Sequence, residues 1–321
     1  MSAGEVVGIR TTAVGRCPGC GGQDREERPL GDTRLWTCGG CGLVYAREFG
    51  DPGQIYVDGY MWGETSFGFD VTPPRFQAYL AGVNRRRCAV AEGVNGGVGS
   101  WLDVGCGRGE VLATAVSRGW RAVGVEPVAD AAAHARSLGL EVRETTLLEA
   151  GLPERSFDIV SAFHVVEHMV DARDFVRSLA RYVRPGGHVL VEVPNFRSMD
   201  RRQRGQAWRG LRPLEHIGHF SPTTLRTLLQ AAGLEDVEVR TPTYVGPPQT
   251  VDEALDDLAL GARAGLLRPL SREVAVTWVE GLEGAVTRLP TRAGWALLRG
   301  VEHIYDRAAV GMVCVGTARV P

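Results

Sequence analysis

The sequence contains no lysine, because all 36 of its Lys and Arg residues are arginines. Without an ε-amine the chain is not a pyridoxal or other Schiff-base enzyme, a phosphate-loop NTPase or a protein kinase. It also has no run of 18 apolar residues and no apolar segment near its start, so we expect no membrane span, no signal peptide and a cytoplasmic location. The net charge of −2 gives no bulk attraction to nucleic acid or to anionic membranes.

Cysteine is scarce as well, and four of the seven cysteines fall within the first 41 residues. They form two C-x2-C pairs separated by seventeen residues: Cys17, Cys20, Cys38 and Cys41. This spacing predicts a tetrahedral Zn²⁺ site. Two disulfides are disfavoured in a reducing compartment, and a redox C-x2-C needs no second pair. Four thiolates leave no open position for chemistry, so the zinc is expected to be structural. The other three are expected to be ordinary buried residues: Cys88, Cys106 and Cys314.

The 321 residues, 44% of them hydrophobic, suffice for about two domains. From position 101 onward, strand and helix patterns alternate as in a parallel α/β sheet. The expected strands are 101–104, 122–126, 141–144, 157–163, 188–193 and 237–240. The expected helices are 75–92, 109–118, 129–138, 172–183 and 222–232. Residues 250–308 have helical periodicity and are followed by a buried strand at 310–318, which we expect to complete the same sheet.

The segment Asp103-Val-Gly-Cys-Gly-Arg-Gly109 follows the first of these strands. Glycines at 105, 107 and 109 let the backbone approach a ligand at the carboxyl end of the strand. Such a motif also fits nicotinamide and flavin enzymes. Asp103, however, would repel a pyrophosphate and suits a ligand with an amino group. Glu126 ends the second strand, where a carboxylate can hold both hydroxyls of a ribose.

These features resemble class I S-adenosylmethionine-dependent methyltransferases over residues 98–241. The resemblance rests on the stretches 103–109, 125–127, 152–158, 167–168 and 184–187. It implies a doubly wound, Rossmann-like α/β sheet that is mostly parallel, with an antiparallel last strand. The expected domains are a zinc ribbon at 1–50, a linker and helical lead-in at 51–97, and a methyltransferase domain at 98–321 with a helical insertion at about 245–308.

The resemblance also implies how the cofactor S-adenosyl-L-methionine is held. Gly105, Gly107 and Gly109 would line its methionine part, Asp103 would meet its amino group, and Glu126 would grip its ribose. Many relatives have an acidic residue after the third strand to bind the adenine. This chain instead reads Thr145-Thr-Leu-Leu-Glu149, so backbone amides near Leu147, or the carboxylate of Glu149, are the candidates there.

The segment His164-Val-Val-Glu167-His168 follows the fourth strand and should face the sulfonium and the methyl acceptor. His164 is a candidate general base and a candidate cofactor contact. A metal-assisted site is a second interpretation, because ubiquinone-pathway O-methyltransferases resemble this stretch with Glu in place of His164. In a third interpretation, Glu167 and His168 cap the following helix.

The stretch after the fifth strand carries six arginines in sixteen residues: Arg197, Arg201, Arg202, Arg204, Arg209 and Arg212. Together with Trp208 they suit a phosphate- or carboxylate-bearing acceptor with a flat or sugar face, although a solvated loop is equally compatible. Glu215-His216 follows and resembles the Glu-His pair of zinc-ribbon-containing deoxysugar C-methyltransferases. We expect His216 to act as the base, with Glu215 orienting its ring, and His219 to pack or to cap the helix that begins near Pro222.

The favoured function is methyl transfer to a small molecule, such as a sugar, nucleotide-sugar or other natural-product or polysaccharide precursor. An rRNA methyltransferase is the alternative, because one such family also joins a zinc ribbon to this fold. The ribbon is nearly neutral, however, with five arginines against four carboxylates over residues 16–47, which argues against a nucleic-acid partner. A cofactor-binding scaffold without activity is the third hypothesis. The oligomeric state stays open.

Overall fold

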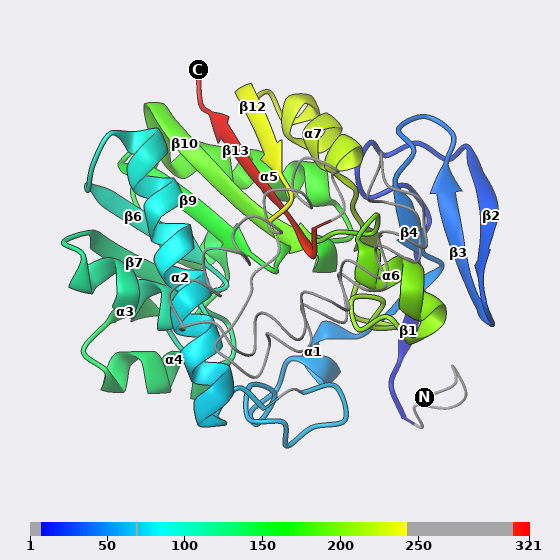
Figure 1. Ribbon diagram of the computed structural model, residues 1–321, viewed down its shortest axis with the longest axis horizontal. Helices are drawn as coiled ribbons and strands as arrows, with labels where there is room; N and C mark the ends of the chain where they lie inside the picture. Colours follow the sequence, from blue (N-terminus) through cyan, green and yellow to red (C-terminus); the bar gives the residue numbers. More distant parts are fainter. Residues whose placement is uncertain (1–7, 69, 243–310) are drawn as a thin grey trace, which may run out of the picture.

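The computed structural model describes residues 8–68, 70–242 and 311–321 (Figure 1). Its centre is a sheet of seven strands. They are β6 (Ser100–Val104), β7 (Arg121–Val125), β8 (Glu141–Arg143), β9 (Phe157–Phe163), β10 (Val183–Pro194), β12 (Glu235–Arg240) and β13 (Val313–Arg319). The expected helical insertion at about 245–308 lies outside the described residues and stays a prediction.

The strand order in this sheet is β12-β13-β10-β9-β6-β7-β8. All neighbouring pairs from β10 to β8 are parallel, whereas β13 runs antiparallel to both β10 and β12. The structure confirms the predicted mostly parallel, doubly wound sheet with an antiparallel last strand. Parallel strands place their carboxyl ends at one edge, so segments that follow β6, β7 and β9 meet there.

Helices cover both faces of the sheet because its central strands are apolar on both sides. They are α2 (Pro74–Asn95), α3 (Glu110–Ser117), α4 (Ala129–Ser137), α5 (Ala172–Tyr182) and α7 (Pro222–Ala231). Successive strand residues point to opposite faces. Trp101 and Ile159 accordingly pack with α2 and α3, whereas Leu102 and Val160 pack with α5 and α7. Burial on both faces explains why these strands read as continuous apolar runs.

Helix α2, which crosses the sheet in Figure 1, is longer than the predicted 75–92. Pro74 occupies its first turn, where a missing N–H costs nothing. It ends at Gly96, which adopts a φ of +73° and lets the amide of Gly97 bond back to the carbonyl of Glu92. Within the described residues, no helix combines the length and apolar character needed to cross a membrane.

The N-terminal segment forms a second sheet beside the first. Its strands are β2 (Arg25–Leu30), β3 (Thr33–Cys38) and β4 (Val44–Ala46), and a separate two-stranded sheet joins β1 (Thr11–Ala13) to β5 (Glu48–Gly50). A fourth strand, β11 (Gly218–His219), pairs with β4 although the two strands lie far apart in the sequence. The shorter elements are α1 (Pro52–Ile55), α6 (Met199–Arg204) and three single turns, η1 (Leu147–Glu149), η2 (Val166–His168) and η3 (Gly205–Ala207).

Candidate functional site

The glycine turn between β6 and α3 lies against the segment that follows β9. The amide of Gly105 donates to the carbonyl of Val125 at 2.8 Å, which ties the turn to β7. Gly105 has a φ of +71°, and a Cβ there would lie 2.6 Å from Cγ2 of Val165. Any side chain at this position would therefore need backbone strain and a shift of Val165. Position 105 therefore requires glycine, because its φ is positive and Val165 fills the space that a Cβ would occupy.

Asp103, next to the end of β6, is only 2% exposed. Its Oδ1 accepts a hydrogen bond from the Ser161 hydroxyl at 2.5 Å, and Nε1 of Trp101 donates to that same hydroxyl oxygen at 2.7 Å. Burial raises the pKa of Asp103 to about 7, although the Ser161 hydrogen bond opposes this shift. Because this pKa lies near 7, a cation bound next to the Asp103 carboxyl readily stabilises its ionised form.

Glu126, just beyond β7, is also buried. Its Oε2 accepts from the amide of Gly107 at 2.8 Å and its Oε1 from the amide of Val128 at 2.9 Å. Burial raises the pKa of Glu126, and the two amides lower it. Each carboxylate oxygen has a second lone pair, so the side chain can still accept from a ligand. Asp103 and Glu126 thus flank the glycine turn from neighbouring strands.

The adenine candidates lie after β8. Leu147 is buried in the main hydrophobic core, and its carbonyl accepts from the hydroxyl of Tyr182 at 3.1 Å. Glu149 is exposed and accepts a hydrogen bond from the Thr146 hydroxyl at 2.6 Å. Neither arrangement tests the adenine role of Leu147 or Glu149, which stays a prediction.

The aromatic-rich segment before α2 covers the glycine turn, a position that no sequence pattern indicates. The amide of Gly59 donates to Oδ2 of Asp130, at the start of α4, at 2.6 Å. A Cβ on Gly107 would lie 3.0 Å from Cε of Met61. Trp62 stacks under the guanidinium of Arg108 at 5.0 Å from the ring centroid. The lead-in segment therefore packs against the glycine turn and the start of α4.

His164 directly follows β9 and adopts a φ of +59°, which is uncommon for a residue with a side chain. Its Nδ1 lies 3.2 Å from Oε1 of Glu167, and its Nε2 lies 3.2 Å from Oε1 of Glu192. Burial lowers the pKa of His164, but the two carboxylates outweigh this effect and raise it to about 9. The side chain is 43% exposed, so solvent screens part of this attraction. A protonated imidazole is a poor general base but can bridge two carboxylates.

Glu192 is fully buried on β10, where it also pairs with Arg87 of α2. Burial by itself raises the pKa of Glu192, but Arg87 and His164 together hold it well below its usual range. A buried carboxylate needs such partners because the removal of its charge from water costs on the order of several kcal/mol. The sequence pattern of residues 75–92 predicted helix α2, but it did not predict the ion pair between this helix and β10.

Glu215 and His216 are both buried, but they do not interact as expected. The Glu215 carboxylate accepts from Nε of Arg212 at 2.9 Å and from the hydroxyl of Tyr60 at 3.1 Å. Nδ1 of His216 lies 2.9 Å from the carbonyl of Gly210, so that carbonyl, and not Glu215, orients the ring. The physical reason is that the buried Glu215 charge requires a cation, and Arg212 supplies it among the described residues.

Burial favours the neutral form of both histidines in this part of the site, His168 and His216. Burial lowers the pKa of His216 well below 6.5, with a further contribution from neighbouring His168. Burial likewise lowers the pKa of His168. Nδ1 of His168 lies 3.0 Å from the backbone carbonyl of Glu215 and 2.7 Å from the Tyr56 hydroxyl. Each ring therefore keeps a nitrogen whose lone pair is available.

The segments that carry His164 and His216 meet at Glu167. The amide of Ile217 donates to the backbone carbonyl of Glu167 at 2.7 Å. One donor atom each from Glu167, His168 and His216 lies within 4.8 Å of the other two. Glu167 and His168 do not cap α5, whose N-cap is Asp171. The convergence of the two segments agrees with the sequence-based expectation, but the capping interpretation was wrong.

The arginine-rich loop is only partly open to solvent. The guanidinium of Arg201 lies 4.5 Å from the Phe196 ring centroid and its Nε donates to the Phe196 carbonyl at 2.8 Å. Arg204 pairs with Asp200, and Arg212 pairs with Glu215. Arg197, Arg202 and Arg209 are exposed and make no such contact with another described residue.

Trp208 is 5% exposed, because it packs with Leu35 and Val44 of the N-terminal sheet and with Phe196. This position corrects the expectation that Trp208 offers a face to a substrate. His219 is buried next to it, with ring centroids 5.5 Å from Phe196 and 6.5 Å from Trp208, and packs as expected. Ser221 and Thr224, not His219, cap α7.

The four N-terminal cysteines lie together, with all four Sγ atoms within 4.8 Å of one another. Sγ of Cys17 is 3.5 Å from that of Cys41, and the Cys20 and Cys38 sulfurs are also 3.5 Å apart. A tetrahedral zinc with bonds of about 2.3 Å places its sulfurs about 3.8 Å apart, so the cluster fits this metal. The contact between Cys17 and Cys41 lowers the pKa of Cys41 and raises the pKa of Cys17, as expected for two thiols that share a proton. The other cysteines, Cys88, Cys106 and Cys314, are buried as expected.

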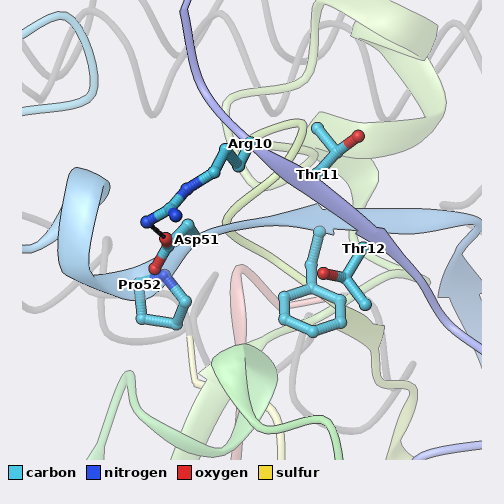
Figure 2. A pocket seen from close by; sticks show the side chains of 6 residues that line it. Arg10, Thr11, Thr12, Asp51 and Pro52 are labelled. Carbon is cyan, nitrogen blue, oxygen red and sulfur yellow. Dashed lines mark hydrogen bonds and ion pairs between the residues drawn. The ribbon is translucent and has the colours of Figure 1, made fainter.

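A surface hollow of about 600 Å³ lies at the β1–β5 pair (Figure 2). It is lined by Arg10, Thr11, Thr12, Phe49, Asp51 and Pro52. Arg10 and Asp51 form an ion pair at its edge. None of the residues predicted for the site lines it, so we assign it no part in the chemistry.

The architecture is that of a Rossmann-like domain with an N-terminal tetracysteine sheet. A family model described as a methyltransferase domain matches residues 76–239, about half of the 321 residues. The chain belongs to this family.

Curated methyltransferases are similar to this chain over parts of their length. A ubiquinone biosynthesis O-methyltransferase from Rhizobium johnstonii is 36% identical over 100 residues, which are 29% of this chain and 40% of the relative. A probable S-adenosylmethionine-dependent methyltransferase from Mycolicibacterium smegmatis is 32% identical over 136 residues, or 42% and 51%. The chain thus matches about half, or less, of the length of these relatives. A solved SAM-dependent methyltransferase from Archaeoglobus fulgidus has a TM-score of 0.49 at 17% identity, covering 76% of this chain and 94% of that one.

Proposed function

We propose that the chain transfers a methyl group from S-adenosylmethionine to a small-molecule acceptor. The observation that carries this proposal is the pair of buried carboxylates, Asp103 and Glu126, on either side of the glycine turn. Asp103 would meet the amino group of the cofactor and Glu126 its ribose hydroxyls. Gly105, Gly107 and Gly109 would line the methionine part, and the backbone near Leu147 would hold the adenine. Family membership supports this assignment.

The acceptor side of the proposed site comprises His164, Glu215 and His216. Methyl transfer from a sulfonium is an in-line displacement, so the protein mainly aligns the reactants and, for a weak nucleophile, helps remove a proton. His216 is the best candidate for this help, because its ring is neutral and held at one nitrogen by Gly210. The lone pair on the other nitrogen can take a proton or bind a metal ion. Glu215 keeps the loop in place through Arg212, and His164 bridges Glu167 and Glu192.

For the acceptor we propose a sugar, nucleotide-sugar or other natural-product precursor. His216 is buried against the ring of His168, which in turn contacts the Tyr56 hydroxyl, and this burial favours a small molecule over a polymer. The exposed Arg197, Arg202 and Arg209 on the adjacent loop suit a phosphate or carboxylate on that molecule. The tetracysteine cluster would hold a structural Zn²⁺, and the nearly neutral composition of its sheet supports a role in folding over one in RNA binding.

The direct test incubates the purified chain with methyl-labelled S-adenosylmethionine and three acceptor pools: nucleotide sugars, phenolic precursors and total RNA. We expect label in a small-molecule product and none in RNA. Label in RNA would establish the alternative function. A chain that binds the cofactor but labels none of these three pools would indicate a scaffold.

A further inference from the structure

A second group of metal-ligand side chains lies outside the tetracysteine cluster. It consists of Glu167, His168 and His216, whose donor atoms lie within 4.8 Å of one another. Metal–nitrogen and metal–oxygen bonds of about 2.0–2.2 Å would draw such donors to roughly 3–3.5 Å, so small side-chain rotations complete a site. The three residues come from two segments, η2 and the loop before β11, which the Ile217–Glu167 backbone hydrogen bond holds together.

Glu167 provides an independent indication of a ligand. Its side chain is 1% exposed, and its Oε1 lies 3.2 Å from Nδ1 of His164. Its Oε2 is buried and has no hydrogen-bond partner among the described residues. A buried carboxylate oxygen without a partner costs about 1–3 kcal/mol, or more when charged. A cation bound at Oε2 removes this cost.

The two imidazoles have the outer contacts that metal ligands commonly show. Nδ1 of His216 lies 2.9 Å from the carbonyl of Gly210, and Nδ1 of His168 lies 3.0 Å from the carbonyl of Glu215. A carbonyl has no proton to offer, so Nδ1 of His216 carries the proton and its Nε2 keeps its lone pair. Nδ1 of His168 also lies 2.7 Å from the Tyr56 hydroxyl; with its proton directed to the Glu215 carbonyl, its Nε2 keeps a lone pair as well. Histidines that bind metals typically donate their other N–H to a backbone carbonyl or a carboxylate in this way.

We propose that Glu167, His168 and His216 form a second metal site, for a divalent first-row transition ion such as Zn²⁺ or Fe²⁺. Two imidazoles and one carboxylate suit such ions better than Mg²⁺ or Ca²⁺, which prefer oxygen ligands. Three protein donors leave at least one position open, in contrast to the closed tetracysteine site. That position is available to water or to a hydroxyl of the acceptor.

This inference deepens the proposed function, and rests on it only for what the ion does, not for whether the ion binds. With His216 as a ligand, its lone pair is used by the metal and does not take the proton itself. The acceptor-side contribution of His216 is then to hold the ion against which an acceptor oxygen is placed. His164, which contacts Oε1 of Glu167, positions the carboxylate.

The experiment uses the full chain with zinc already bound at the tetracysteine site and titrates it with Co²⁺. Visible absorption and metal analysis report binding and stoichiometry. We expect one Co²⁺ per chain beyond the zinc, in the unmodified chain and in the matched control His219→Gln, whose histidine is buried three residues away. Glu167→Gln, which preserves shape, and His216→Gln should each bind Co²⁺ at least tenfold more weakly.

The absence of a second bound ion in the unmodified chain would overturn the proposal, even if a variant failed to fold. Equal Co²⁺ affinity in Glu167→Gln, His216→Gln and the unmodified chain would overturn it too. S-adenosylmethionine affinity and methyl transfer are measured on the same samples. Methyl transfer that persists with a single zinc per chain, bound at the tetracysteine site, refutes a role of the second ion. Metal binding without methyl transfer refutes the proposed function and leaves the site intact.

Discussion

The backbone amide of Ala46, in the tetracysteine sheet, donates to the carbonyl of Ile217, the residue after His216, at 2.8 Å. The pairing of β11 with β4 and the packing of Trp208 on Leu35 and Val44 extend this contact. The N-terminal sheet therefore supports the loop that carries Glu215 and His216. Cysteines that lie far from His216 in sequence hold that support together.

We expect Cys38→Ser to remove the metal and to lower the melting temperature by several degrees, because metal binding contributes to folding and each 1 kcal/mol lost shifts the melting temperature of a domain of about 150–250 residues by about 2–4 °C. Zinc analysis and calorimetry check this prediction. Cys88→Ser, at a buried cysteine of α2, is the control and should retain the full zinc content. An unmodified chain that contains no zinc, or a Cys38→Ser chain as stable as the parent, would rule out the structural metal.

A pH dependence follows from the pKa of Asp103, which burial raises to about 7. Because its pKa in the folded chain lies above the ordinary value of about 3.9, its contribution to stability is present below about pH 4 and is lost as the pH rises through 7. The negative charge of Asp103, in contrast, forms as the pH rises through about 7. Cofactor binding through an ammonium group should therefore strengthen between pH 5.5 and 7.5.

Equilibrium titration of S-adenosylmethionine at several pH values measures this trend. The variant Asp103→Asn keeps the size of the side chain but has no charge to gain, so its affinity should be low and nearly constant over this range. A parent chain whose affinity does not change between pH 5.5 and 7.5 would separate Asp103 from the amino group of the cofactor.

His216→Gln should lower turnover roughly a hundredfold, the range for loss of a group that assists proton removal, while the cofactor dissociation constant stays unchanged. The expectation is the same whether the ring takes the proton or holds a metal ion. His219→Gln is the matched control and should affect stability more than turnover. Turnover of His216→Gln within a factor of two of the parent would show that alignment alone drives the reaction.

The parallel sheet was predictable because its signals are local. The apolar run 157–163 coincides with β9, and Asp103 and Glu126 are neighbours because strands β6 and β7 are adjacent. The long interval in sequence between β12 and β13 was also predictable, because a buried apolar run near the C-terminus indicated one further strand of the sheet. Helix and strand ends shifted by a few residues where proline and glycine set the boundary, as at Pro74 and Gly96.

The acceptor side was less predictable because its contacts join segments far apart in sequence. Arg212 looked like a ligand for an anion, but it neutralises the buried Glu215, and Tyr60 joins the pair from 152 residues away. The aromatic composition of the lead-in segment was visible, but its position over Gly107 depends on the fold. Similarly, no local pattern links His168 to His216, whose rings lie 4.7 Å apart.

The central claim, a cofactor site between β6 and β7, is tested most directly by calorimetric titration of S-adenosylmethionine into the unmodified chain and into Glu126→Ala. Loss of a hydrogen bond to a charged group predicts binding weaker by about 1–3 kcal/mol, or roughly 5- to 150-fold. Glu144→Ala, at an exposed residue that pairs with Arg136, should bind like the parent. An unmodified chain that does not bind the cofactor, or a Glu126→Ala chain with the parent's dissociation constant, would contradict the account.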